Sequence, residues 1–343
     1  VKKFDADGPA SARSRMSHQL QLTACAVSTN STPERADLPS PRTLWSVRGQ
    51  KPMLRLWCKL HEKLVKSAAT WRPPTGGGLA LLGDSITESW RGTEFGRRVP
   101  RAHGVPRVLR ETLGTRWPEP LVLGIAGDQT QHLLWRLQHG EAAASWTQAS
   151  EMLTVLLIGT NNLGAGQRPA EAAAGVLAAA SWLLRHTAGR VLVLGALPRA
   201  DAWRLRQLCP AACRREGAEE ARAATFLGRG KVRSRCVCDA ARRARRSFMP
   251  AVLRLNRLVL PAVVALGPRA AFADCGGDFV PPAGAREAGV RRDLMPDALH
   301  PNASGHRVMA RCVTAALDRF AIDRQPSRAV VEEARGNTVA VAR

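Results

Sequence analysis

Four short apolar runs divide the middle of the chain, and each ends in small or polar residues. They are LALLGDS (79–85), LVLGIAGD (121–128), VLLIGTNN (155–162) and VLVLGALP (191–198), and a fifth run, AAFADC, spans 270–275. None of them alternates apolar and polar positions, as a strand with one solvated face would. The pattern therefore predicts strands that are buried on both faces, which is typical of a parallel sheet.

Longer stretches with apolar residues at spacings near 3.6 separate these runs and predict helices. The first covers 53–70, where Leu54, Trp57, Leu60 and Leu64 fall on one face, and it ends before the breaker run RPPTGGG. Further helices are predicted at 131–139, 170–186, 249–266 and 303–320. The alternation of strand and helix predicts a three-layer α/β/α fold around a parallel sheet.

Polar residues gather where three of the predicted strands end, in GDS, GIAGD and GTNN. In open parallel sheets, ligands bind beyond the carboxyl ends of the strands. Because these ends meet at one edge, the sequence predicts a functional site there that is assembled from segments far apart in the chain.

Four segments are predicted along the chain. Residues 51–321 carry the alternation and form the predicted domain. Residues 1–50 are rich in Ser, Thr, Pro and Arg with little periodicity, which is typical of disorder or of a targeting segment, and we favour disorder. Residues 200–247 break the alternation with four cysteines and the run RRARR, so we expect a surface insertion that is solvated or poorly ordered. Residues 322–343 are predicted to be a flexible tail.

The 343-residue chain has a formal net charge of +23, carried by 51 Lys and Arg against 28 Asp and Glu. Nearly all of the positive charge is arginine scattered through an Ala- and Gly-rich background, which favours a solvated basic surface over a nucleic-acid site. We therefore expect no nucleic-acid partner. The apolar stretches 152–158 and 191–197 fall far short of the about 20 residues that cross a bilayer, so no transmembrane segment is predicted.

Eight cysteines are too sparse in a chain of this length to indicate a disulfide scaffold. Cys209 and Cys213 form a CxxxC pair, and Cys236 and Cys238 form CxC, but neither has the CxxC spacing usual for zinc. We expect free or incidental cysteines and no metal, and the redox compartment stays open.

Three residues have the types needed for nucleophilic catalysis by a serine. A serine hydroxyl attacks only when a base removes its proton, and a carboxylate must orient that base and stabilise its cation. Ser85, Asp297 and His300 supply these roles in the order Ser, Asp, His. The chain has no GxSxG elbow of the α/β-hydrolase type. Asp297 lies only three residues before His300, so one short loop can present both side chains to Ser85.

Cleavage of an ester passes through an oxyanion, which needs hydrogen-bond donors already in place. The backbone N–H groups of Ser85 and Gly127 and the side-chain amide of Asn161 are the predicted donors. All three belong to the strand ends that the sheet brings together. The predicted catalytic set is Ser85, Asp297 and His300, and the predicted oxyanion hole is Ser85, Gly127 and Asn161.

These residues resemble, in order, the four signature blocks of the SGNH/GDSL hydrolase family. A fuller likeness, through GIAGDQTQHLLWRLQHGE (124–141), VLLIGTNNLG, VLGALPRAD and DLMPDALHPNASGH, is to the catalytic alpha subunits of intracellular platelet-activating-factor acetylhydrolase. The resemblance covers about 53–320 apart from the insertion. It implies a flavodoxin-like five-stranded parallel sheet of order 2-1-3-4-5, no metal or cofactor, and hydrolysis of a short acyl ester, acetyl first.

Other polar residues near these motifs have simpler roles by expectation. The four left out of the catalytic set as loop or cap formers are Asp84, Asp128, Thr160 and Asn162. His132 and His306 are expected to be helix-surface or capping residues, and Trp135 a core residue.

The sequence leaves more than one function open. The leading hypothesis is an esterase that acts on a small-molecule, lipid or carbohydrate ester. The same acyl-enzyme could instead transfer the acyl group to another alcohol. From a different class, the chain could be a non-catalytic scaffold that binds polyanions or anionic membrane through Arg242–Arg246. A homodimer is compatible with the sequence.

Overall fold

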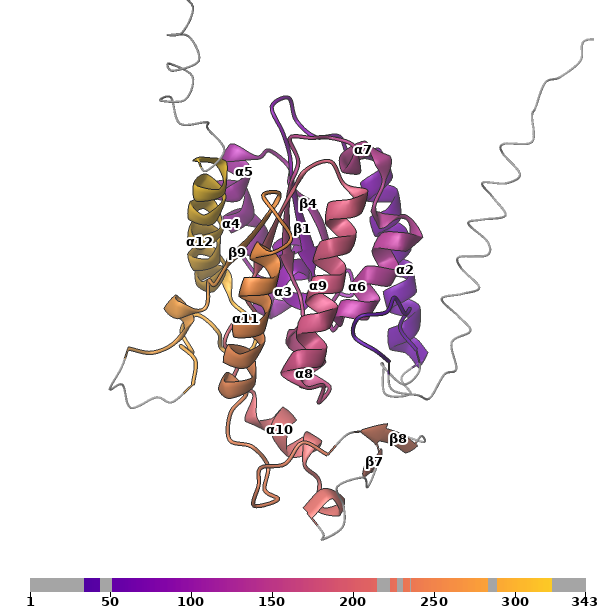
Figure 1. Ribbon diagram of the computed structural model, residues 1–343, viewed down its shortest axis with the longest axis vertical. Coiled ribbons are helices and arrows are strands. Elements are labelled where there is room, and N and C mark those ends of the chain that lie inside the picture. Colours follow the sequence, from indigo (N-terminus) through magenta and orange to yellow (C-terminus); the bar gives the residue numbers. More distant parts are fainter. Residues whose placement is uncertain are drawn as a thin grey trace, which may run out of the picture.

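The computed structural model describes residues 34–43, 51–214, 223–226, 231–234, 236–282 and 289–322. Its centre is a sheet of five parallel strands in the order β4-β1-β5-β6-β9 (Figure 1). Their bounds are β1 Leu79–Gly83, β4 Leu121–Gly124, β5 Leu153–Leu157, β6 Arg190–Leu194 and β9 Ala270–Ala273. Numbered along the chain, these five strands have the order 2-1-3-4-5, which confirms the predicted sheet.

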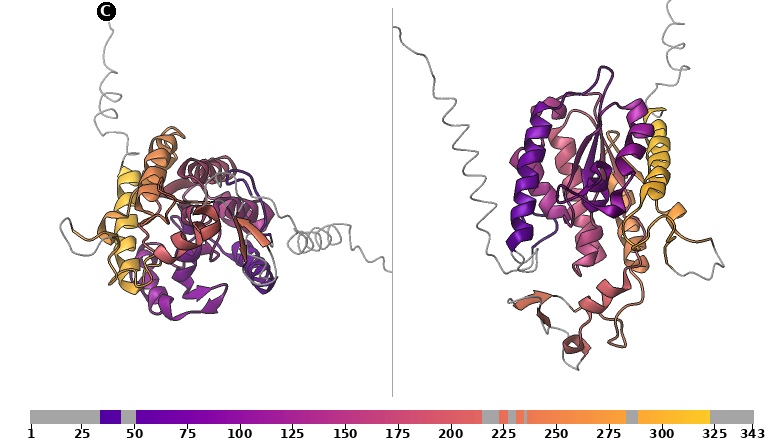
Figure 2. Two further views of the ribbon diagram at one scale, coloured as in Figure 1. Left: turned by 90° about the horizontal axis from the view of Figure 1, so that it is seen from below. Right: turned by 180° about the vertical axis from the view of Figure 1, so that it is seen from behind.

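Helices cover both faces of the sheet (Figures 1 and 2). One face packs against α2 (Lys51–Thr70), α6 (Thr130–Arg136), α9 (Pro169–His186) and α11 (Met249–Val264), and the other against α4 (Val105–Glu111), α5 (Leu113–Arg116) and α12 (Ala303–Ile322). Along β1, Ala80 and Leu82 belong to the first core, whereas Leu79 and Leu81 belong to the second. The unbroken apolar runs of β1, β4, β5 and β6 are explained by burial of both strand faces, whereas three of the four residues of the edge strand β9 are only half-buried. The three-layer α/β/α fold is confirmed.

Shorter elements connect these layers. The helices are α3 Ser85–Glu88, α7 Ala144–Thr147, α8 Thr160–Gly164 and α10 Ala202–Leu208, and the small hairpins are β2 Thr93–Glu94 with β3 Arg97–Arg98 and β7 Ala223–Phe226 with β8 Lys231–Ser234. Within the described ranges, no helix is both long and apolar enough to cross a membrane.

The cysteines differ from the expectation that they would be free or incidental. Disulfides join Cys209 to Cys238, Cys213 to Cys236 and Cys275 to Cys312. The CxxxC and CxC halves pair across the insertion in a nested order, because its two ends run side by side; spacing within each half does not reveal this. Cys58 is also disulfide-bonded, and Cys25 lies outside the described residues.

The insertion 200–247 projects beyond the carboxyl ends of the strands (Figures 1 and 2). The expectation of a solvated or poorly ordered insertion was wrong for its first part, because α10 is helical and its Leu205 and Leu208 are buried in the core. At its root, the buried guanidinium of Arg199 pairs with Asp201 and donates to the carbonyl oxygen of Thr160 at 2.6 Å. The two disulfides join the two ends of the insertion to each other, and Arg199 at its root is hydrogen-bonded to the first residue of α8.

Part of the N-terminal segment is also more ordered than expected. Residues 34–43 lie against α6, where Ser40 N–H donates to the carbonyl oxygen of Gln131 at 3.1 Å and Ala36 is buried. The rest of 1–50, and 323–343, lie outside the described residues. Glu34 supplies a charged partner to His132 of α6, and Arg42 supplies one to Asp128 in the loop before α6. Local sequence periodicity reveals neither contact.

Candidate active site

Ser85 begins α3, directly after β1. Asp84 caps this helix, since its Oδ1 accepts a hydrogen bond from the Ile86 N–H at 3.0 Å. Gly83 lets α3 approach the strand ends closely: a Cβ there would lie 2.2 Å from the Leu157 carbonyl oxygen and 2.4 Å from Thr87 Oγ1. The short sequence GDS thus turns the chain and holds Ser85 at the edge of the sheet, and the expected capping role of Asp84 is confirmed.

Asp297 and His300 lie on one tight turn before α12. Asp297 Oδ1 accepts the backbone N–H groups of Leu299 at 3.0 Å and His300 at 2.7 Å. Ala298 has φ +64°, and its carbonyl oxygen accepts the Ala200 N–H at 2.8 Å. This left-handed residue folds the turn so that Asp297 Oδ2 meets His300 Nδ1 at 2.6 Å.

Ser85 and His300 are brought together across 215 positions of sequence, with Ser85 Oγ 2.9 Å from His300 Nε2. When Nδ1–H of the imidazole donates to Asp297, Nε2 is the unprotonated nitrogen that can accept the serine proton. Burial by itself raises the pKa of Asp297, but the hydrogen bonds and charge of His300 outweigh it and lower that pKa to about 2. The Asp297 carboxylate is therefore ionised at neutral pH and can stabilise a positive charge on the His300 imidazole.

His306 connects α3, which carries Ser85, with the start of α12, which follows the turn of Asp297 and His300. It was expected to be a surface or capping residue, but it is fully buried. Its Nε2 lies 3.2 Å from the carbonyl oxygen of Ile86, next to Ser85, and its Nδ1 lies 3.0 Å from that of Asn302. The ring also packs edge-on against Trp90. His306 therefore holds the start of α12 against α3.

The protonation of His306 predicts how stability depends on pH. Burial lowers its pKa from 6.5 to about 4, although contacts with carbonyl oxygens raise it. Since the folded-state pKa is the lower one, the stabilising contribution is complete above about pH 6.5 and is lost as the pH falls towards 4. We expect His306 to account for about 2 kcal/mol of lost stability between about pH 7 and about pH 5, measured by urea unfolding.

Comparison with His306→Gln isolates this effect, because that variant should lose about 2 kcal/mol less over the same interval. The exposed His103 offers a matched control, and His103→Gln should keep the pH dependence of the parent protein. Parallel curves for the parent and His306→Gln would refute the assignment.

His132 was expected to be a helix-surface or capping residue, and this prediction was right about capping but wrong about exposure. Its Nδ1 accepts the Gln129 N–H at 3.0 Å, which is a capping contact, but the ring is fully buried and its Nε2 lies 2.7 Å from Glu34. The side chain therefore attaches residues 34–43 to the start of α6. Trp135 lies in the core, as predicted.

The loop after β4 carries Gly127, the second predicted oxyanion donor. Its φ is +76°, and a Cβ there would lie 2.6 Å from the Arg42 guanidinium. The loop is held beside α3, because the Ala126 N–H donates to Glu88 Oε2 at 2.7 Å. Within the part of the chain that the structure describes, the N–H groups of Ser85 and Gly127 donate to no other protein group.

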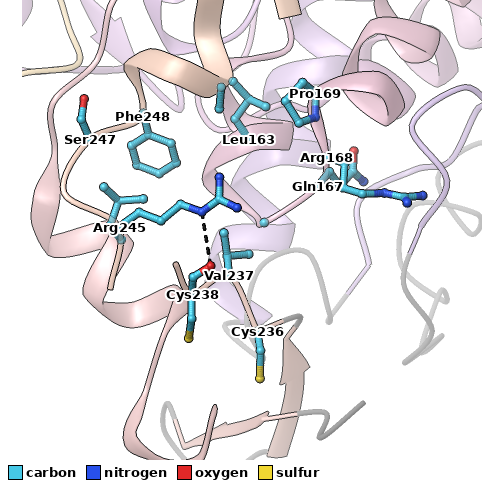
Figure 3. Close-up of a pocket in the computed structure, with 13 residues that line it drawn as sticks. Leu163, Gln167, Arg168, Pro169, Cys236, Val237, Cys238, Arg245, Ser247 and Phe248 are labelled. Atoms are coloured by element: carbon cyan, nitrogen blue, oxygen red, sulfur yellow. Dashed lines mark hydrogen bonds between the residues drawn. The ribbon is translucent and has the colours of Figure 1, made fainter. Parts of the chain in front are cut away.

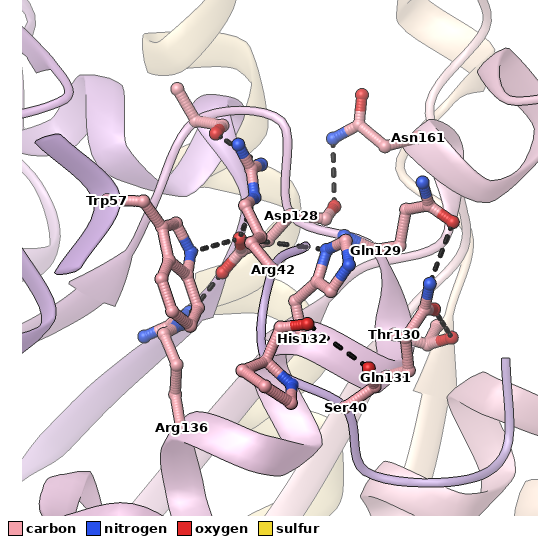
Figure 4. Close-up of polar contacts among 12 residues, drawn as sticks. Ser40, Arg42, Trp57, Asp128, Gln129, Thr130, Gln131, His132, Arg136 and Asn161 are labelled. Carbon is pink, nitrogen blue, oxygen red and sulfur yellow. Dashed lines mark hydrogen bonds and ion pairs between the residues drawn. The ribbon is translucent and has the colours of Figure 1, made fainter. Parts of the chain in front are cut away.

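Asn161 lies on α8 and points towards the same loop (Figure 4). Its Nδ2 donates to the Asp128 carbonyl oxygen at 2.9 Å. A primary amide has two N–H hydrogens, so the second one is left for another acceptor. The structure thus brings Asn161 to the Asp128–Gln129 peptide, in the loop that carries Gly127, as the strand-end argument predicts.

A buried charge network supports this loop from behind (Figure 4). Asp128 accepts hydrogen bonds from Arg42 at 3.1 Å, Trp57 Nε1 at 2.8 Å and Arg136 at 2.7 Å. Arg136 also pairs with Glu141 and donates to the Gly83 carbonyl oxygen at 3.2 Å. Sequence reasoning expected Asp128 only to form a loop or cap and did not connect Arg42, Trp57 or Arg136 with the site. Arg42 and Trp57 are distant from Asp128 in the chain, and the burial that makes the Arg136 pairs important is decided by packing.

Two pockets lie near the carboxyl edge of the sheet. One, of about 360 Å³, is lined by Asp297 and His300 together with Arg101, His103 and Asn302. The other, of about 480 Å³, lies where the insertion meets α8, α9 and α11, and its lining includes Leu163, Val237, Arg245 and Phe248 (Figure 3). Only the first contains members of the predicted catalytic set. The described residues hold no cluster of three or more His, Cys, Asp or Glu side chains suited to a metal ion.

Comparison with known proteins agrees with this geometry. Residues 81–308 match the model of the GDSL-like Lipase/Acylhydrolase family. Over 147 residues, 42% of the chain, it is 31% identical to platelet-activating factor acetylhydrolase IB subunit alpha1 of Homo sapiens and 37% identical to subunit alpha2 of Homo sapiens. The match spans about half of these relatives, 52% and 53% of their lengths.

A solved structure from Streptococcus pneumonia, whose protein is named provisionally as a platelet activating factor, has the same fold. The superposition has a TM-score of 0.51 at 18% identity and covers 81% of this chain and all of that one.

Proposed function

Because the chain belongs to the GDSL-like lipase/acylhydrolase family, we propose that it is a serine esterase that cleaves short acyl esters, acetyl esters first, through an acyl-enzyme on Ser85. One observation carries the proposal: Ser85 Oγ lies 2.9 Å from His300 Nε2, while His300 Nδ1 lies 2.6 Å from Asp297. A hydroxyl, an imidazole and an ionised carboxylate in series are what general-base activation of a serine requires.

In the first half of the reaction, Ser85 Oγ attacks the ester carbonyl carbon as its proton passes to His300 Nε2. The imidazolium that forms is stabilised by Asp297, whose lowered pKa keeps it ionised. His300 then gives the proton to the leaving alkoxide, and the C–O bond to the alcohol breaks. The acyl group is left on Ser85.

In the second half, a water molecule replaces the alcohol. His300 removes its proton as it attacks the acyl carbon, and the same nitrogen returns a proton to Ser85 Oγ when the acid leaves. The groups used are side chains and backbone N–H groups of this chain, so the proposed mechanism calls for no metal or cofactor.

Both tetrahedral intermediates place negative charge on the former carbonyl oxygen. The unpaired N–H groups of Ser85 and Gly127 and the second amide hydrogen of Asn161 are the donors we assign to it. Being fixed by α3, the Asp128 network and α8, they need no reorganisation during the reaction, which is the source of such stabilisation.

Replacing Asn161 with alanine tests the oxyanion assignment. We expect kcat for p-nitrophenyl acetate to fall by about 10²- to 10³-fold, with KM little changed, because the lost donor acts mainly on the transition state. Steady-state kinetics on the purified variant measures both values. A rise in KM at constant kcat would instead indicate a ground-state contact.

A series of p-nitrophenyl esters of increasing acyl length tests the acetyl assignment, which rests on the acetylhydrolase names of the relatives. We expect kcat/KM to be highest for acetate and to fall as the chain lengthens. A maximum at a long acyl chain would contradict the acetyl preference while leaving the Ser85 mechanism intact.

A further inference from the structure

Helix α11 has large apolar side chains on its outer side. Leu253, Leu260 and Val264 are 45%, 47% and 63% exposed. Within the described residues, the set of exposed large hydrophobic side chains contains only two others, Leu38 and Trp203. Exposed apolar side chains scattered singly are ordinary on protein surfaces, but a group of three on one helix indicates a contact surface.

Helical geometry puts these three residues in one stripe. At 100° per residue, positions 253, 260 and 264 fall within about 40° of one another. The opposite side of α11 carries the buried Leu255, Val259 and Val263, which belong to the core. A helix that is apolar on both sides usually has partners on both sides.

Positive charge accompanies this stripe. Arg254 and Arg257 are exposed beside it, and α11 contains no acidic residue. We call Leu253, Arg254, Arg257, Leu260 and Val264 together the α11 face. The adjoining insertion adds to the charge: α10, 236–248 and α11 contain eight arginines and a single acidic residue, Asp239.

Trp203 lies on the neighbouring helix α10. Leu205 of α10 shares a pocket with Phe248 and Ala251 at the start of α11, so the two helices are adjacent (Figures 1 and 3). Tryptophan and arginine are side chains that favour the boundary between lipid headgroups and acyl chains.

We propose that the α11 face binds the surface of an anionic lipid bilayer. Its apolar stripe enters the headgroup region, and its arginines pair with anionic headgroups. A second copy of the chain fits less well, because a symmetric contact would bring two α11 faces together, and α11 has arginines but no acidic residue to pair with those of the other copy. A nucleic acid would use the arginines but leave the leucines without a function.

Sedimentation with vesicles tests the proposal on the full chain. We expect binding to phosphatidylcholine vesicles that contain phosphatidylserine, little binding to phosphatidylcholine alone, and weaker binding at high salt. The double variant Arg254→Glu/Arg257→Glu should bind at least about thirty-fold more weakly. Leu253→Asn/Leu260→Asn, which leaves the charge unchanged, should also lose at least about tenfold.

Arg55→Glu/Arg110→Glu is the matched control, because both arginines are exposed, lie on α2 and α4, and change the net charge equally. It should retain vesicle binding. An equal loss in this control, no loss in the leucine variant, or no vesicle binding by the parent protein would overturn the proposal. Hydrolysis of soluble p-nitrophenyl acetate should be the same in all three variants, so the esterase proposal is judged separately.

Discussion

Replacing Ser85 with alanine is expected to lower kcat for p-nitrophenyl acetate by at least about 10⁴-fold without unfolding the protein. Loss of the nucleophile removes the acyl-enzyme route altogether, and what remains is catalysis by binding and by the oxyanion donors. The fold should tolerate the change, because Ser85 Oγ contacts only His300 Nε2 among the hydrogen bonds of the described residues.

Stopped-time assays of purified protein measure the rate, and circular dichroism with urea unfolding checks the fold. Ser304→Ala is the matched control, because Ser304 lines the same pocket as His300 but has no hydrogen bond to its imidazole within the described residues. It should keep activity within a few-fold of the parent. Undiminished hydrolysis by Ser85→Ala would exclude the proposed mechanism.

A fluorophosphonate probe provides an independent measurement of the same residue. The probe reacts with activated serines, so labelling should occur at Ser85 in the folded parent protein and disappear in Ser85→Ala. His300→Gln should also prevent labelling, since Ser85 then has no base. Labelling of a different serine would contradict the assignment of Ser85 as the nucleophile.

Replacing Arg136 with methionine is expected to lower the free energy of unfolding by about 3 to 5 kcal/mol. The guanidinium is fully buried and pairs with two buried carboxylates, Asp128 and Glu141. It also donates to the carbonyl oxygens of Gly83 and Leu123. Methionine fills a similar volume but leaves both carboxylates without this partner in a region of low dielectric, which is the costly case.

Urea unfolding of the parent and the variant measures this difference. Arg110→Met is the control, because Arg110 is exposed on α4, and it should change stability by less than about 0.5 kcal/mol. The loss of stability in Arg136→Lys should lie between those of Arg136→Met and Arg110→Met. An ammonium keeps the charge but cannot bridge both carboxylates with a planar fork. A loss below about 1 kcal/mol in Arg136→Met would show that the network is not what stabilises the loop.

Much of the fold could be predicted from the sequence, because strands buried on both faces leave unbroken apolar runs and the helices between them repeat near 3.6. Both patterns are local. The order of strands was predicted only through the family resemblance, since apolar runs carry no information about which strand is whose neighbour. The pattern itself put Ser85, Gly127 and Asn161 at strand ends and Asp297 beside His300. The resemblance added that these five residues match, in order, the signature blocks of one family.

The errors fell where a side chain's partner is distant in sequence. The cysteines of the insertion pair across 29 and 23 positions, so the spacing within each half was misleading. His306 has the local pattern of a helix-surface residue, and it is buried because α12 packs against α3. Glu34 contacts α6 and Arg42 contacts the loop before it, although nothing in their own segment has helical or strand periodicity.

By itself, then, the sequence determined the element types, the polar strand ends and the local turn in which Asp297 holds His300, because these depend on neighbours within a few residues. Tertiary structure decided that His300 meets Ser85 across 215 positions, that Arg136 neutralises Asp128 and Glu141 in the interior, and that α11 keeps an apolar face on the outside. The physical reason is that burial and pairing belong to the packed chain: the same residue types would be solvated and unpaired if the layers packed differently.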